Sequence, residues 1–123
     1  MERFISMEHF SIYHNPRCSK SRQTLNLMKE KGINPTIILY LENKPKVNEL
    51  KKILDLMNMK PRELLRKGED DYKIFNLNDS SKSDEEILKI MSENPKLIER
   101  PIVVTDNKAV IGRPPENIFK ILK

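Results

Sequence analysis

The fold of this chain is decided by the stretch Phe10-Ser11-Ile12-Tyr13-His14-Asn15-Pro16-Arg17-Cys18-Ser19-Lys20-Ser21-Arg22. Residues 10–13 predict a short strand, and the polar loop 14–17 follows it. Residues 19–31 carry apolar side chains at helical spacing and end before Gly32, which predicts a helix with a glycine stop. Cys18, the only cysteine of the chain, is therefore expected at the start of a helix.

The next apolar stretch, residues 35–40, is rich in β-branched residues and apolar on both faces, so it predicts a buried strand. A strand, a helix and a second strand joined by short links predict a right-handed parallel unit.

The middle of the chain is helical in pattern. Residues 47–57 place their apolar side chains on one face, and Pro61 suits the first turn of a short helix. Ser83 and Glu86 form a capping-box pattern, which predicts a helix that runs to about Glu93.

The end of the chain returns to strand. Residues 101–105 and 109–112 flank the turn-like 106–108 and predict a hairpin, and residues 114–122 predict a last amphipathic helix. The order βαβ, helical insert, ββα predicts an α/β protein with a mixed sheet, and it resembles a thioredoxin-like fold. We expect a single domain at 10–123 with a helical insert at about 46–95, and an N-terminal extension at 1–9.

Composition limits the function. The chain has 123 residues, 37% hydrophobic and 33% charged, with a net charge of +5 that weakly favours anionic partners. Scattered lysines and the absence of tryptophan argue against a nucleic-acid surface, and we expect no membrane partner. One cysteine allows no internal disulfide, and the N-terminus does not resemble a secretory signal, so we expect a cytoplasmic protein.

Cys18 is expected to be a reactive thiolate. Backbone N–H groups without helical partners point toward the start of a helix, where they lower a thiol pKa and can bind an anion. Arg17 and His14 could each add positive charge or a hydrogen bond. The alternative, a buried structural cysteine, fits poorly with such polar neighbours.

Two further features concern the same loop. Ser21 stands where a dithiol redox motif would have its second cysteine, so the resolving thiol must come from outside the chain. His14 could equally be a loop histidine that bonds its own backbone. Two histidines and one cysteine give no cluster with metal-ligand spacing, so no metal site is expected.

Three arginines are candidate anion ligands, although each alone is most often a surface arginine with an acidic neighbour. Arg100 and Arg113 lie at strand ends, where open α/β sheets collect ligands, and Arg66 ends a short apolar turn. A guanidinium presents a planar fork of donors that matches oxyanions. In thioredoxin-like folds a cis-proline faces the active cysteine, and Pro101 takes that place, which would bring Arg100 to the thiolate.

Together these pieces resemble the glutaredoxin-linked arsenate reductases. The matching segments run in order from about Ser11 to Leu122, and they are Ile12-Tyr13-His14-Asn15-Pro16-x-Cys18-x-x-Ser21-Arg22, Pro35 to Asn43, Leu64-Leu65-Arg66-Lys67, Arg100 to Thr105, and Arg113-Pro114, where x marks a position that does not carry the resemblance.

The resemblance implies a mechanism. Cys18 would attack arsenate to give a thioarsenate intermediate, glutathione would form a mixed thiol–arsenic species, and glutaredoxin would complete the reduction to arsenite. Arg66, Arg100 and Arg113 would bind arsenate, and His14 would help to lower the pKa of the cysteine. Glutathione would be a co-substrate with no bound cofactor, and a monomer is expected.

The basic loop at 17–20 departs from the small neutral residues typical of this family, and the extension 1–9 precedes its usual start. Two alternatives use the same fold. A thiol oxidoreductase acting on glutathione mixed disulfides needs Cys18 but not three arginines. A transcription regulator that binds RNA polymerase senses redox state through a Cys-x-x-Cys pair, which Ser21 removes.

Overall fold

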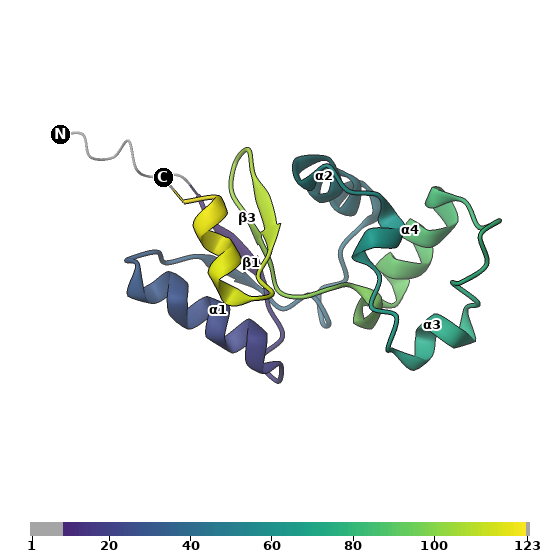
Figure 1. Ribbon diagram of the computed structural model, residues 1–123, viewed down its shortest axis with the longest axis horizontal. Helices are drawn as coiled ribbons and strands as arrows, with labels where there is room; N and C mark the ends of the chain where they lie inside the picture. The colour runs from purple at the N-terminus through teal and green to yellow at the C-terminus, as the bar shows by residue number, and fades with distance from the viewer. Residues whose placement is uncertain (1–8, 123) are drawn as a thin grey trace. The chain divides into compact units, whose positions relative to one another are not determined.

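The structure, a computed structural model, describes residues 9–122 and divides into two compact units (Figure 1). The first unit extends to Leu39 and resumes at Arg100, and the second is Tyr40–Glu99. The helical insert predicted at about 46–95 falls within the second unit. Of the predicted N-terminal extension, residues 1–8 lie outside the described residues.

The first unit is built on a four-stranded sheet with the strand order β2-β1-β3-β4. Its strands are β1 (Ser11–Tyr13), β2 (Thr36–Ile38), β3 (Ile102–Val104) and β4 (Ala109–Ile111). β1 pairs with β2 in parallel, and β3 runs antiparallel to both β1 and β4. The parallel βαβ unit and the C-terminal hairpin that the sequence predicts are therefore confirmed.

Two helices complete this unit. The helix α1 (Ser19–Glu30) and the 3-10 helix η4 (Pro115–Lys120) lie side by side (Figure 1). Their apolar side chains pack with those of the sheet, where full burial of one such side chain contributes about 1.5–3 kcal/mol. The buried members of this core are Ile12, Leu25, Met28, Val103, Ile118 and Ile121.

One sequence expectation for this unit is wrong. The stretch 35–40 forms a strand but not a buried one: β2 is the edge of the sheet, and its Ile37 is 45% exposed. The helix predicted at 114–122 is present as the 3-10 helix η4, which buries Ile118, whereas its Phe119 is 45% exposed. The ammonium group of Lys31 lies 5.3 Å from the centre of that phenyl ring, a cation–π distance.

The second unit is helical. It contains α2 (Val47–Met57), η2 (Pro61–Leu64), α3 (Asp70–Ile74), α4 (Asp84–Glu93) and η3 (Pro95–Leu97). α2 and α4 pack against each other, with Leu50, Ile53 and Leu54 buried on α2 and Ile87, Leu88 and Met91 on α4.

The predicted capping box of α4 is confirmed. The Ser83 hydroxyl accepts a hydrogen bond from the Glu86 N–H at 3.1 Å, and the Glu86 carboxylate accepts one from the Ser83 N–H at 2.8 Å. Across residues 9–122, no helix combines the length and apolar character that a membrane crossing requires.

Candidate active site

Cys18 occupies the N-cap of α1 because the preceding loop turns tightly. The Arg17 N–H donates to the Asn15 side-chain oxygen at 3.0 Å, and the Cys18 N–H donates to the Asn15 carbonyl at 3.0 Å. The Cys18 carbonyl then accepts the first helical bond, from the Arg22 N–H at 3.0 Å. Cys18 itself is extended, with φ −94° and ψ 123°, as an N-cap residue should be. The predicted start of the helix is confirmed.

The surroundings of the Cys18 thiol favour the thiolate. Partial burial alone would raise the pKa of Cys18, but the Ser21 N–H, the Arg100 guanidinium and the Lys20 N–H outweigh it. The pKa therefore lies below its ordinary value of 9.0. The sulfur accepts no capping bond of regular geometry, so these N–H groups act on it chiefly as nearby dipoles at the helix start.

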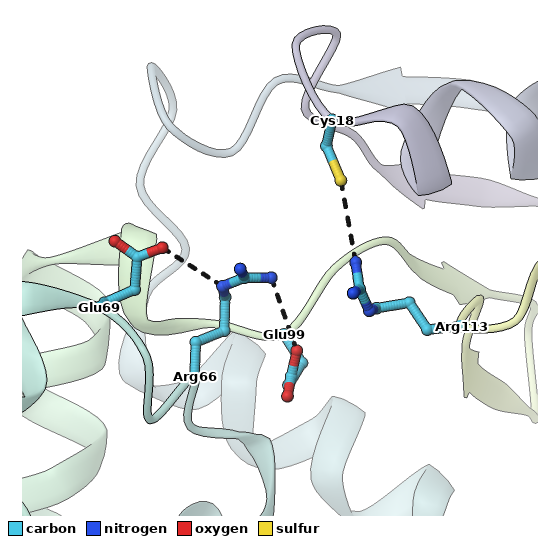
Figure 2. Close-up of polar contacts among 5 residues, drawn as sticks. All are labelled: Cys18, Arg66, Glu69, Glu99 and Arg113. Atoms are coloured by element: carbon cyan, nitrogen blue, oxygen red, sulfur yellow. Dashed lines mark hydrogen bonds and ion pairs between the residues drawn. The ribbon is translucent and has the colours of Figure 1, made fainter.

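Two of the three candidate arginines lie at this sulfur. The Arg100 guanidinium lowers the pKa of the Cys18 thiol through hydrogen bonding and charge, and the peptide bond between Arg100 and Pro101 is cis. Arg113 follows β4, and its Nη1 lies 3.9 Å from the Cys18 Sγ (Figure 2). The expected cis-proline and the expected placement of Arg100 beside the thiol are therefore both confirmed.

His14 is buried, and its ring contacts a serine. The Nδ1 atom lies 2.6 Å from the Ser21 Oγ, which also accepts the Asn15 N–H at 3.0 Å. Burial, followed by the charges of Lys29 and Arg22, lowers the pKa of His14 below its ordinary value of 6.5. The ring is therefore mainly neutral near pH 7, and it contributes a hydrogen bond to the loop and no positive charge.

Ser21 has a role that the sequence did not indicate. It is fully buried, its hydroxyl joins His14 to the Asn15 backbone, and its own N–H favours the Cys18 thiolate. In the sequence, Ser21 was notable only because it stands where a dithiol motif would have its second cysteine. The one available signal was its position on the first turn of the helix, where a hydroxyl can bond back to the loop.

Arg66, the third candidate, lies in the second unit, where it contacts two carboxylates. Its guanidinium lies 3.3 Å from the Glu69 carboxylate and 3.7 Å from that of Glu99 (Figure 2). A backbone bridge between Leu65 and Ile98 brings Arg66 beside Glu99. The backbone N–H of Arg66 donates to the Leu97 carbonyl at 2.7 Å. The alternative of a surface arginine with an acidic neighbour therefore describes the contacts of Arg66, although the sequence did not identify Glu69 or Glu99 as the neighbours.

The arrangement at Cys18 can bind an oxyanion and attack it. Two guanidinium groups and the N–H groups of a helix start supply positive charge, and the thiolate supplies the nucleophile. Within residues 9–122, no group of three or more His, Cys, Asp and Glu side chains is arranged to hold a metal ion.

Residues 13–121 match the model of the ArsC family. The chain belongs to the ArsC family. It is 54% identical to the uncharacterized protein YfgD of Escherichia coli K12, over 90% of this chain and 94% of that protein. It is 48% identical to an arsenate reductase of Haemophilus influenzae, over 90% of this chain and 97% of that one.

A solved structure extends this likeness to the fold. The arsenate reductase from Vibrio cholerae superposes with a TM-score of 0.91 at 48% identity, and the match covers 94% of this chain and 98% of that one. The predicted thioredoxin-like fold is thereby confirmed. Cys18, His14, Arg66, Arg100 and Arg113 all lie within the segment that matches the ArsC family.

Proposed function

We propose that the protein is an arsenate reductase in which the Cys18 thiolate attacks arsenate. The observation that carries this proposal is the Cys18 sulfur at the start of α1, with a lowered pKa and with Arg100 and Arg113 beside it. Arsenate is substantially dianionic near neutral pH, so an anionic thiolate can approach it only where cations neutralise the developing charge. Membership of the ArsC family and the names of its relatives point to the same substrate.

The reaction needs two electrons from outside the chain. Attack of the Cys18 sulfur on arsenic forms an S–As bond, and one arsenate oxygen leaves as water after protonation. A glutathione thiol then replaces a second oxygen in the same way. When a glutaredoxin thiol attacks the glutathione sulfur, a mixed disulfide forms, As(V) becomes As(III), and hydrolysis releases arsenite and Cys18.

Ser21 supports the requirement for external thiols. It occupies the third position after Cys18, where a second cysteine could have closed a disulfide, and Cys18 is the only cysteine of the chain. Each turnover therefore oxidises two external thiols and leaves Cys18 reduced. We propose glutathione and glutaredoxin as their sources on the family's pattern, with no bound cofactor and with the protein acting as a monomer in the cytoplasm.

The proposed ligands of arsenate are Arg66, Arg100 and Arg113. The contacts of Arg100 and Arg113 with the thiol support the assignment of these two. Arg66 is assigned on the family pattern Leu64-Leu65-Arg66-Lys67 alone. His14 is proposed to assist the thiolate through Ser21, because its ring bonds to the residue whose N–H lowers the pKa of Cys18.

A coupled assay tests the proposal. Purified protein, glutathione, glutaredoxin and glutathione reductase should oxidise NADPH only when arsenate is added. Omission of glutathione or glutaredoxin in turn shows which thiol is required, and gel filtration gives the oligomeric state. Turnover of a glutathione mixed disulfide without any turnover of arsenate would instead identify a thiol oxidoreductase.

A further inference from the structure

Gly112, directly after β4, has no room for a side chain. A Cβ atom built on it would lie 2.8 Å from both the Cγ2 and the Oγ1 of Thr24, and 3.0 Å from the Cγ of Pro101. Its N–H donates to the Pro101 carbonyl at 2.8 Å, and its carbonyl accepts from the Thr24 hydroxyl at 3.0 Å. Three segments that are distant in sequence therefore meet at this glycine, which we name the Thr24–Gly112–Pro101 junction.

Each segment of the junction carries a group of the thiol site. Arg113 follows Gly112 directly, and Arg100 precedes Pro101 directly. Thr24 belongs to α1, the helix whose N-cap is Cys18. A shift of one segment against the others would therefore change the distance from a guanidinium group to the sulfur.

We propose that Thr24 and Gly112 are positioning residues, which fix Arg100 and Arg113 at the Cys18 sulfur and so set the affinity of the site for an oxyanion. The oxyanion part of this inference rests on the proposed function. The positioning part depends only on the geometry of the thiol site.

The contacts of Thr24 go beyond those of an ordinary helical threonine. Its hydroxyl approaches the Lys20 carbonyl at 2.8 Å, which is the usual bond back to the preceding turn. The same hydroxyl also reaches Gly112, and its single hydrogen is shared between the two carbonyls. Thr24 is fully buried, so water cannot replace this donor.

The thiol site is sensitive to small displacements. At 3.9 Å, the contact between the Arg113 Nη1 and the Cys18 sulfur is near the limit for a hydrogen bond to sulfur. Hydrogen bonds weaken steeply with distance and angle, and charge interactions fall as the separation grows. Misplacement of a site group by about 1 Å can cost up to about 10²-fold in rate.

The test compares two buried threonines of the first unit. Thr24→Val keeps the shape of the side chain and removes the hydroxyl that holds Gly112. The control is Thr105→Val, because Thr105 is 4% exposed and its hydroxyl bonds within the turn after β3, to Lys108. Each variant is measured for thermal stability, for the pH dependence of Cys18 alkylation by iodoacetamide, and for kcat and KM with arsenate.

We expect Thr24→Val to move the alkylation midpoint to higher pH, because Arg100 is displaced from the thiolate. The kcat/KM for arsenate should fall by about 10- to 100-fold, with a raised KM. Thr105→Val should lose stability but keep the parent midpoint and KM. Thr24→Ser, which retains the hydroxyl, should restore most of the parent midpoint.

Gly112→Ala tests the junction from its other side, because the added methyl group must push Thr24 and Pro101 apart. It should shift the midpoint in the same direction as Thr24→Val. The inference is wrong if either variant folds and keeps the parent midpoint, or if Thr105→Val shifts it equally. Alkylation does not involve arsenate, so a parent protein without arsenate turnover would refute the proposed function while this comparison still decides the positioning role.

Discussion

In the unit that carries Cys18, the guanidinium groups of Arg100 and Arg113 face a sulfur, whereas in the other unit that of Arg66 faces two carboxylates. The first arrangement keeps positive charge beside a nucleophile and lowers its pKa. The second compensates positive charge locally, since Glu69 and Glu99 together carry more charge than the one guanidinium.

This difference separates two roles that an arginine can take toward an anionic substrate. A guanidinium beside the thiol acts on both the nucleophile and the anion that it attacks. A guanidinium held by carboxylates has a fixed orientation but must share its donors with them. Substitutions at Cys18 and at each arginine test whether this distinction governs the chemistry.

The largest effect should come from Cys18→Ser. A serine hydroxyl stays protonated at neutral pH, so the thiol site loses its nucleophile. Arsenate turnover in the coupled assay should therefore vanish. The far-UV circular dichroism should match the parent because no disulfide is lost. Appreciable remaining turnover would mean that Cys18 is not the nucleophile of the reaction.

Arg100→Ala should cause the next largest loss of turnover, and it should also change the pKa of Cys18. Loss of a cation that stabilises the thiolate raises the pKa of Cys18, so the alkylation midpoint moves to higher pH. Loss of an anion ligand should lower turnover by roughly 10²–10³-fold, the scale of one oxyanion donor.

Arg113→Ala is the matched variant at the same sulfur, and its turnover should also fall. If both variants turned over arsenate like the parent, the anion site could not lie at Cys18.

Arg66→Ala should differ most clearly from Arg100→Ala, because only one of the two measured quantities should change. The groups that lower the pKa of Cys18 are Arg100 and the N–H groups of Ser21 and Lys20, so we expect the alkylation midpoint of Cys18 to stay at the parent value in Arg66→Ala while arsenate turnover falls. The cost in stability should be within about 1 kcal/mol, because these ion pairs are partly exposed. A midpoint that moves as far as in Arg100→Ala would remove the distinction between the two kinds of arginine.

The sequence predicted features that depend on local signals, and it missed contacts between distant segments. The turn before Cys18, the glycine stop after α1 and the Ser83–Glu86 capping box are local signals, and each was confirmed. Arg100 was placed beside the thiol because the order of the elements puts Pro101 opposite the cysteine. Glu99 was not identified as a partner of Arg66 because that contact depends on a backbone bridge between residues far apart in the sequence, whereas Glu69 stands only three positions after Arg66.

Exposure was the least predictable property. The apolar stretch at 35–40 predicts a strand correctly, but only the strand order shows that β2 is an edge, where Ile37 remains exposed. The helix α3 has five residues and buries none of them, so it carries no amphipathic pattern to find. The junction at Gly112 was invisible for a similar reason, since it depends on a close approach between three distant segments.

The smallest effect should be a change in how stability depends on pH, and it should trace to His14. Its pKa is lowered in the folded protein, chiefly by burial, so below the ordinary value of 6.5 the unfolded chain binds a proton that the folded chain does not. The free energy of unfolding should therefore fall as the pH falls from 6.5 toward the lower pKa of the folded state. His14→Asn should flatten this dependence in denaturant titrations, and its amide can still bond to Ser21. An unchanged pH dependence in His14→Asn would show that the surroundings of Cys18 do not hold this histidine neutral.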